Sequence, residues 1–178
     1  MARAVGTKES LIIAVFIFVS IAVFMLANTG DETPEEQMRE AQADPAPALS
    51  LADLESNEAI SLDAYTDRPL LIHFFASWCP LCSNTARNVA TYYDEAGDFD
   101  VLLVALDPRE TDDTLVSFKS ENGRESWRLA RLTPVVEDAF DVRSLDTKVV
   151  IADGEIVHRD NQGWQSADAR RILGGLTP

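Results

Sequence analysis

The sequence predicts an α/β domain with a central mixed sheet flanked by helices, preceded by one N-terminal transmembrane helix. Three observations support this prediction. An uncharged apolar run covers residues 11–27. Two further apolar runs, at 69–75 and 99–106, are typical of strands buried on both faces, and each precedes a segment with helical periodicity. Finally, two strand-like segments flank Asp153 and Gly154, a strong hairpin signal.

The first apolar run predicts a membrane anchor. As a helix, residues 11–27 would measure about 25 Å, slightly less than the ~30 Å hydrocarbon core of a bilayer. Arg3 and Lys8 precede the run and acidic residues follow it. Because cytoplasmic loops favour Lys and Arg, we expect a single-pass protein of the cell membrane with residues 1–10 in the cytoplasm and the C-terminal domain outside it. A cleaved signal peptide is the alternative, although the run is long for one.

Composition divides the rest of the chain. Residues 28–48 are polar, acidic and interrupted by proline, which is typical of a flexible linker. Residues 49–178 suit one α/β domain. The chain has a net charge of −15. Because so acidic a protein repels phosphate backbones, we expect no nucleic-acid partner.

The domain's elements can be read in order from apolar periodicity and capping residues. We expect a short strand at 59–62, a strand at 69–75, a helix at 83–96 ended by Gly97, a strand at 99–106, a helix capped by Thr111 or Asp112 and ending near 122, a short helix at 134–140 capped by Thr133, a hairpin of 148–152 with 155–159, and a last helix from Ser166 to Gly174. A parallel centre with an antiparallel edge fits this order.

Cys79 and Cys82 are the only two cysteines in the chain. Cys79 ends a predicted buried strand, and Pro80 suits the first position of the following helix. Cys79 is therefore expected at a helix N-terminus, where unpaired amides and the helix dipole stabilise a thiolate. Cys82, one turn later, can attack a mixed disulfide formed on Cys79. The pair therefore predicts thiol–disulfide exchange.

Other functions of a cysteine pair fit less well. A structural zinc ion needs four ligands, and the whole chain offers two Cys and two His. A purely structural disulfide that closes so short a loop stabilises little. A peroxidase of the peroxiredoxin type would need Thr three residues before the first Cys, where this chain has Ala76. An interaction domain that no longer catalyses a reaction stays open as a further alternative.

Several segments share the pattern of one known family. They are Ile60–Leu62, the FFASWCPLC stretch at 74–82, the acidic loop after 104–106, residues 139–145 and the Asp153–Gly154 hairpin. The roughly 130 residues from 49 onward thereby resemble the thioredoxin superfamily, most closely its TlpA/ResA-like membrane-anchored thiol–disulfide oxidoreductases.

This resemblance implies a thioredoxin-like fold and assigns roles to the motif. It implies that Cys79 attacks, that Cys82 resolves, and that Pro80 and Leu81 between them help to set the redox potential. Trp78 is expected to shape the contact surface, although packing is the alternative. No cofactor is implied beyond the redox-active disulfide itself. Expected partners are protein thiols or disulfides and, if the domain is a reductase, a membrane thiol electron donor, because the chain has no second cysteine pair that could reduce the first one again.

Two positions depart from the family pattern. Thioredoxin has an acidic residue six positions before the first Cys, and here that residue is His73. A neutral imidazole could take the proton of Cys82, or His73 could be an ordinary core histidine. The substrate groove is expected at Leu145, Asp146 and Thr147, where Asp146 replaces the cis-proline of the family. A cis bond before a non-proline residue costs about 2.5–4 kcal/mol, so we expect a trans bond.

Asp146 also opens an alternative function. Its carboxylate could oppose the Cys79 thiolate or complete a metal site with Cys79 and Cys82. Residues 104–111 are similar to a segment of Sco-like copper chaperones, so the alternative is a copper-binding metallochaperone or a thiol reductase for metalloprotein assembly. Copper(I) prefers sulfur and imidazole to carboxylate, and no His lies between 74 and 157. The primary prediction therefore includes no metal.

Overall fold

The computed structural model of the chain describes residues 44–176. Its elements in chain order are β1 (Ser50–Ala52), β2 (Ala59–Ser61), the 3₁₀ helix η1 (Leu62–Ala64), β3 (Leu70–Phe75), α3 (Pro80–Ala96), β4 (Asp100–Ala105), α4 (Asp112–Asn122), β5 (Arg128–Arg131), α5 (Pro134–Ala139), β6 (Thr147–Ala152), β7 (Glu155–Asp160) and α6 (Ser166–Leu173). The predicted anchor at 11–27 lies outside the described residues. Among residues 44–176, no helix has the length and apolar character needed to cross a membrane.

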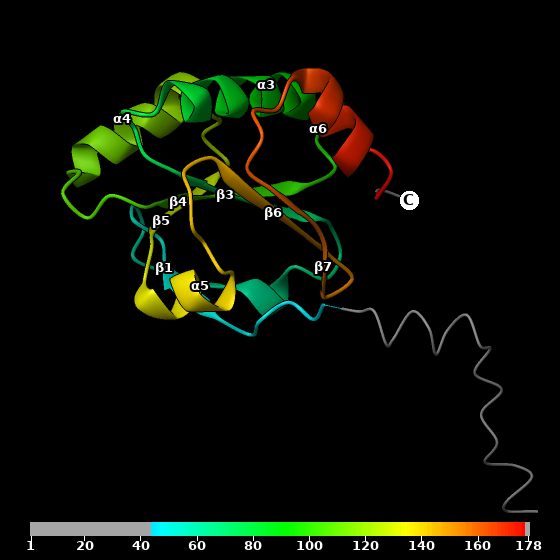
Figure 1. Cartoon of the computed structure of the whole chain (residues 1–178), viewed down its shortest axis with the longest axis horizontal. Coiled ribbons are helices and arrows are strands. Elements are labelled where there is room, and N and C mark those ends of the chain that lie inside the picture. The colour runs from blue at the N-terminus through cyan, green and yellow to red at the C-terminus, as the bar shows by residue number, and fades with distance from the viewer. Residues whose placement is uncertain (1–43, 177–178) are drawn as a thin grey trace, which may run out of the picture. The chain divides into compact units, whose positions relative to one another are not determined.

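Five strands form the central sheet in the order β5-β4-β3-β6-β7. Strands β3, β4 and β5 run parallel, whereas β6 is antiparallel to both β3 and β7. Helices α3, α4 and α6 cover one face of this sheet, and α5 lies on the other (Figure 1). The mixed sheet flanked by helices that the sequence predicts is confirmed.

Side chains of the central strands alternate between two cores. On β3, Leu71 and Phe75 belong to the core that also contains residues of α3, whereas Ile72 and Phe74 belong to the core on the opposite face. His73 has the same parity as Leu71 and Phe75, so it points toward α3. A titratable side chain is thereby directed at the helix that begins beside the cysteines.

Helix ends follow the predicted capping residues. Pro80 occupies the first turn of α3, and Gly97 ends this helix with a φ of 65°, a left-handed conformation that glycine adopts without strain. Thr111 and Thr133 cap α4 and α5, each through a side-chain oxygen that accepts a backbone amide three residues further on. The structure thus selects Thr111 over Asp112 as the cap of α4.

Strands β1 and β5 were not predicted from the sequence. Strand β5 has four residues, carries arginine at both ends and contains no β-branched residue. It forms because it pairs in parallel with β4, and because Arg128 donates a hydrogen bond to Asp53 at 2.8 Å. Short strands of this kind depend on tertiary partners rather than on a local sequence signal.

The first described residues contact the domain. Pro45 forms a β-bridge with Glu155, and the Ala46 amide donates to the Gly154 carbonyl at 2.9 Å. The sequence places both residues in the linker that ends at 48. Backbone contacts therefore hold this end of the predicted linker against the β6–β7 hairpin.

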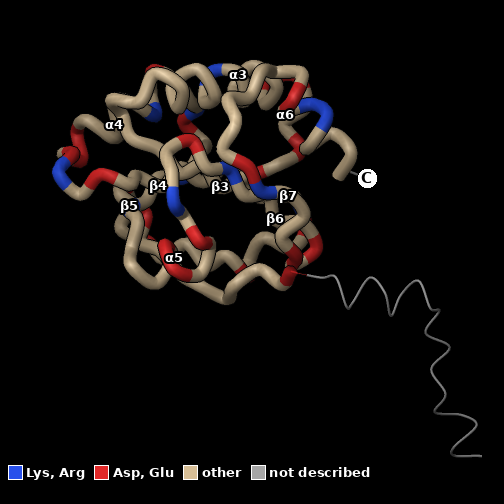
Figure 2. The backbone as a smooth tube through the Cα atoms, viewed as in Figure 1, with Lys and Arg blue, Asp and Glu red and all other residues tan. Residues whose placement is uncertain are grey.

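Charged residues are distributed over the described part of the chain. Figure 2 shows Asp and Glu on helices of both faces and on the connecting loops, with Lys and Arg interspersed. Several arginines pair with acids, as Arg124 does with Asp94 and Arg170 with Glu95. Several positive charges are therefore already paired, and the acidic residues in excess give the surface its net negative charge.

Candidate active site

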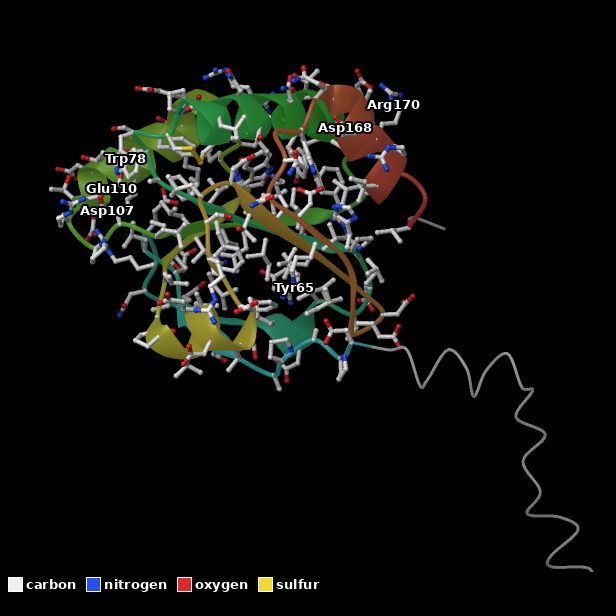
Figure 3. The ribbon with its side chains drawn as sticks, viewed as in Figure 1. Tyr65, Trp78, Asp107, Glu110, Asp168 and Arg170 are labelled. Atoms are coloured by element: carbon white, nitrogen blue, oxygen red, sulfur yellow. A yellow bond between two sulfur atoms is a disulfide. The ribbon has the colours of Figure 1, made fainter. Side chains whose placement is uncertain are left out.

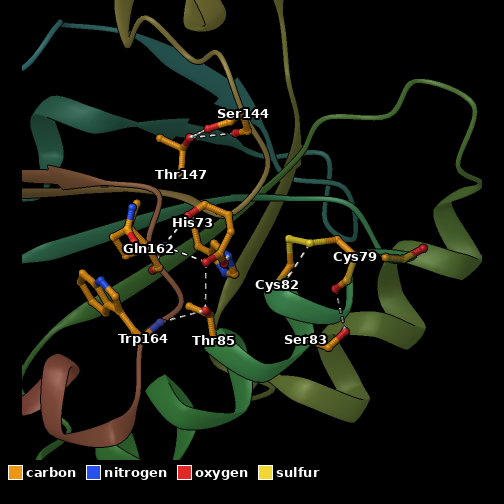
Figure 4. The surroundings of a disulfide bond; sticks show 12 residues. His73, Cys79, Cys82, Ser83, Thr85, Ser144, Thr147, Gln162 and Trp164 are labelled. Carbon is orange, nitrogen blue, oxygen red and sulfur yellow. Dashed lines mark hydrogen bonds and ion pairs between the residues drawn. A yellow bond between two sulfur atoms is a disulfide. The ribbon is translucent and has the colours of Figure 1, made fainter.

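The two cysteines form a disulfide at the start of α3 (Figure 4). Cys79 is the capping residue of this helix, and its Sγ accepts a hydrogen bond from the Cys82 amide at 3.1 Å. Cys79 is 6% exposed, whereas Cys82 is fully buried. The predicted position of Cys79 at a helix N-terminus is confirmed, and Cys79 is the more exposed of the two cysteines.

Trp78 stands on the surface beside the disulfide. It is 60% exposed, and its Nε1 donates to Asp107 Oδ2 at 3.0 Å. Hydrogen bonds from the side chain and the amide of Arg109, with a further one from Trp78, hold the pKa of Asp107 well below its usual range. Figure 3 shows Trp78, Asp107 and Glu110 at the same end of the molecule. The loop after β4 therefore fixes the orientation of an exposed aromatic ring.

Glu110 accepts hydrogen bonds from Ser77, two residues before Cys79. Its Oε1 accepts hydrogen bonds from the amide of Ser77, at 2.8 Å, and from the Ser77 hydroxyl. Its Oε2 is buried and has no hydrogen-bond partner among the described residues. The loop after β4 thus contacts both residues that precede Cys79.

Behind the disulfide lies a group of buried polar side chains. In the β3–β6 register, His73 is the direct partner of Lys148, and cross-strand partners share one face of a sheet. Asp146 lies immediately before β6. An imidazole nitrogen of His73, the Sγ of Cys82 and a carboxylate oxygen of Asp146 all lie within 4.8 Å of one another.

Every oxygen of the Asp146 carboxylate has a partner. Oδ1 lies 2.8 Å from His73 Nε2, while Oδ2 accepts from Thr85 Oγ1 at 3.1 Å and from Lys148 Nζ at 2.9 Å. His73, Asp146 and Lys148 are each no more than 1% exposed. Lys148 Nζ also donates to the Gln162 carbonyl at 2.6 Å and lies 3.3 Å from Asp160 Oδ1. The buried charges are therefore paired, as the low dielectric of a protein core requires.

These contacts determine the ionisation of the group. Burial lowers the pKa of His73, although the hydrogen bond and charge of Asp146 act in the opposite direction. Burial alone would raise the pKa of Asp146, but hydrogen bonds from His73 and Lys148 and the Lys148 charge outweigh it, and the pKa is lowered. At neutral pH, His73 is therefore neutral and Asp146 is ionised.

The segment predicted to form the substrate groove, Leu145 to Thr147, includes Asp146 of this group. Leu145 is half-buried, whereas Asp146 and Thr147 are buried. Among the described residues no peptide bond is cis, so the bond before Asp146 is trans, as expected. Asp146 has a φ of 59°, the left-handed region that aspartate tolerates better than most residues. The Thr147 hydroxyl donates to the Ser144 carbonyl at 2.8 Å and holds this turn (Figure 4).

The alternative metal set of Cys79, Cys82 and Asp146 does not fit this geometry. The set that the structure brings together is another one: an oxygen of Asp146 lies within 4.8 Å of Cys82 Sγ and of a His73 ring nitrogen. The Asp146 oxygens already accept hydrogen bonds from His73, Thr85 and Lys148, and a buried ammonium 2.9 Å away repels a cation.

Sequence reasoning found both cysteines, His73 and Asp146, but it missed Lys148, Thr85 and the loop carboxylates. One signal was present for Lys148. A lysine within the otherwise apolar run 147–152 requires a buried counter-charge, and Asp146 is the nearest acid in the chain. Thr85 and Glu110 carry no such signal, because their partners lie far away in sequence.

The fold and the dithiol site define a thiol–disulfide oxidoreductase of the thioredoxin superfamily, as predicted. The family model described as Redoxin matches residues 41–173. The chain belongs to the Redoxin family.

Known proteins are similar to this chain in part of the sequence or in fold. The tryparedoxin of Trypanosoma brucei brucei is 29% identical over 77 residues, which make up 42% of this chain and only 50% of that relative. A thioredoxin-like protein from Aeropyrum pernix shares the fold, with a TM-score of 0.64 and 18% identity over 79% of this chain and 94% of its own. A thiol:disulfide interchange protein from Chlorobium tepidum has a TM-score of 0.66 and 19% identity over 76% and 97%.

Proposed function

We propose that this protein exchanges disulfides with protein substrates outside the cytoplasm, through the Cys79–Cys82 pair. One observation carries the proposal: a disulfide at the N-terminus of α3, whose more exposed cysteine, Cys79, directly follows the exposed Trp78. The helix terminus favours the thiolate form of Cys79 when the pair is reduced.

The reaction proceeds by two thiolate attacks. In the reducing direction, the Cys79 thiolate attacks one sulfur of a substrate disulfide, a mixed disulfide forms, and the other substrate sulfur leaves as a thiolate. The Cys82 thiolate then attacks Cys79 Sγ and releases the second substrate sulfur. Two electrons pass from the Cys pair to the substrate. The oxidising direction reverses these steps.

A reductase of this kind needs an external electron source. Because the chain has only two cysteines, we propose a membrane thiol donor that regenerates the reduced pair. The uncharged run at 11–27 supports a location in the same membrane, and the Lys and Arg before it support export of the domain.

A trapping experiment tests the assignment of the two sulfurs. In full-length protein, Cys82→Ser should accumulate mixed disulfides with substrate proteins, because the resolving thiol is missing, whereas Cys79→Ser should accumulate few. Reducing and non-reducing electrophoresis of the purified protein measures the difference. A redox titration of wild-type protein with glutathione should show a reversible two-electron couple.

Two results would contradict this function. Equal trapping by both variants would remove the distinction between attacking and resolving sulfurs. Tight copper(I) binding that abolishes exchange would favour a copper-handling protein instead.

A further inference from the structure

We propose that Asp146 is a positioning residue: by accepting a hydrogen bond from His73 Nε2, it holds the imidazole in the tautomer whose Nδ1 takes the proton of Cys82. Lys148 in turn holds Asp146 as a carboxylate. This inference rests on the proposed disulfide exchange and concerns its resolving step. Asp146 stands where the related family has cis-proline, so the arrangement belongs to this chain rather than to the family pattern.

The tautomer follows from the hydrogen bond. An ionised carboxylate can only accept hydrogen bonds, so the 2.8 Å contact with Asp146 Oδ1 requires a proton on His73 Nε2. A neutral imidazole carries one N–H, so Nδ1 must then hold a free lone pair. His73 Nδ1 is buried and has no hydrogen-bond partner among residues 44–176. A buried polar atom without a partner destabilises the folded state, so its presence calls for an explanation. A role as proton acceptor supplies one.

Cys82 needs such an acceptor. It is fully buried, so its thiol proton cannot pass directly to bulk water. The imidazole of His73 lies in the same buried space, with a ring nitrogen within 4.8 Å of Cys82 Sγ. When Cys82 attacks the mixed disulfide on Cys79, its proton moves to His73 Nδ1, the Cys79–Cys82 bond forms, and the substrate sulfur leaves with its electron pair. His73 then returns the proton to solvent.

Lys148 balances the negative charge of Asp146. It is fully buried and lies between Asp146 and Asp160, at 2.9 Å and 3.3 Å from their carboxylate oxygens. Its ammonium group keeps Asp146 ionised, and an ionised Asp146 stabilises the imidazolium that forms when His73 accepts a proton. Thr85 donates one more hydrogen bond to Asp146 and adds no charge.

The charged groups around His73 predict opposite pH effects for two variants. These groups are Asp146 and Lys148 from the β6 segment, Cys82 from α3 and, behind Lys148, Asp160 of β7. Asp146 raises the pKa of His73 and Lys148 lowers it. The rate of the resolving step should fall as His73 becomes protonated at acid pH. In Asp146→Asn this fall should occur at lower pH than in the wild type, and in Lys148→Met at higher pH.

Stopped-flow kinetics of the full-length protein separate the two thiol steps. Reduced protein is mixed with dithiobis-nitrobenzoate: the first aromatic thiolate reports mixed-disulfide formation on Cys79, and the second reports attack by Cys82. We expect Asp146→Asn to slow the second phase roughly tenfold and His73→Ala about 100-fold, with the first phase changed by less than about threefold. Thr85→Val is the matched control, because it removes one hydrogen bond to Asp146 and leaves every charge in place.

Nitrogen NMR supplies a readout that loss of stability alone would not change. The chain contains only two histidines, so His158 serves as the internal reference in Asp146→Asn and Thr85→Val, which leave its partner Asp160 unchanged. Wild-type His73 should show a protonated Nε2 and an unprotonated Nδ1. Asp146→Asn should give a mixture of tautomers, and Thr85→Val should keep the wild-type pattern. If Asp146→Asn does not fold, the charge-balanced double variant Asp146→Asn/Lys148→Met takes its place.

The possible outcomes are distinct. If wild-type protein shows no second phase, the proposed function itself fails. If exchange is normal but His73 carries its proton on Nδ1, or Asp146→Asn leaves the second phase and its fall at acid pH unchanged, the role of Asp146 is overturned. A slow second phase in Asp146→Asn with a normal one in His73→Ala would make the carboxylate itself the base and would also overturn the proposal.

Discussion

Among single residues, Trp78 differs from the cysteines that follow it because it is exposed and they are buried. The indole nitrogen donates a hydrogen bond to Asp107, and Trp78, the residue before Cys79, is 60% exposed. Large aromatic side chains with such exposure supply much of the binding energy at protein contacts. Trp78 therefore fits the contact role predicted for it better than a packing role.

Trp78→Ala should distinguish protein substrates from small ones. We expect reduction of a protein disulfide to slow roughly tenfold, because the contact area of the ring is lost. Reduction of hydroxyethyl disulfide, which makes no such contact, should change by less than about twofold. Steady-state rates with both substrates measure this effect.

Asp107→Asn is the matched control for the Trp78 variant. This variant keeps the Trp78 ring and weakens only its hydrogen bond to residue 107. It should therefore slow reduction of the protein disulfide less than Trp78→Ala does. Equal losses on both substrates in Trp78→Ala would show that the ring supports the cysteines rather than the substrate contact.

At the scale of elements, Asp53 joins the β1–β2 hairpin to the central sheet. Its Oδ1 accepts the amides of Glu55 and Ser56 at 3.1 Å and 2.9 Å, and its Oδ2 accepts from Arg128 of β5 at 2.8 Å. Burial alone would raise the pKa of Asp53, but the hydrogen bonds from Ser56 and the charge of Arg128 outweigh it, and the pKa is lowered. The carboxylate therefore stabilises the folded state while it is ionised.

Asp53→Asn should reduce the free energy of unfolding by about 2 kcal/mol at neutral pH, because bonds to a charged acceptor are lost. A lowered folded-state pKa means that this stabilisation is fully present above the unfolded value of about 3.9 and is lost as the pH falls through the folded value. The difference between variant and wild type should therefore shrink below about pH 4. Denaturant unfolding across this pH range measures it.

Glu58→Gln is the control for the Asp53 variant. Glu58 contacts the same arginine at 3.5 Å, but its side chain is 71% exposed, and exposed pairs contribute less than about 1 kcal/mol. A loss in Asp53→Asn that is constant down to pH 2 would show that geometry rather than charge is responsible.

At the scale of the whole molecule, the proposed anchor determines which compartment the cysteines face. Membrane-impermeant maleimide, applied to intact cells after mild reduction, should label Cys79 of the full-length protein, because the domain is expected outside the cytoplasm. Mass spectrometry of the purified chain identifies the labelled residue.

A matched control carries its thiol on the other side of the membrane. Gly6→Cys in a chain with Cys79→Ser and Cys82→Ser should react only after the cells are permeabilised. The reverse pattern, with Gly6→Cys labelled and Cys79 protected in intact cells, would invert the proposed orientation.

Much of the fold could be predicted because its signals are local. The apolar runs of β3 and β4, the caps Thr111 and Thr133, and the turn at Asp153–Gly154 each act within a few residues of their own position. Strand β5 has no such signal and exists through its pairing with β4. Elements of this second kind become visible only when their partners are known.

The sequence by itself determined where the dithiol stands: a buried strand, Cys79 and Pro80 are consecutive, and their conformational preferences place the first sulfur at a helix terminus. Only the tertiary structure decided what lies behind Cys82. His73 and Asp146 are 73 residues apart, and the β3–β6 register brings Lys148 opposite His73. The physical reason is that local periodicity specifies which face of a strand is buried, whereas the neighbours on that face depend on strand pairing.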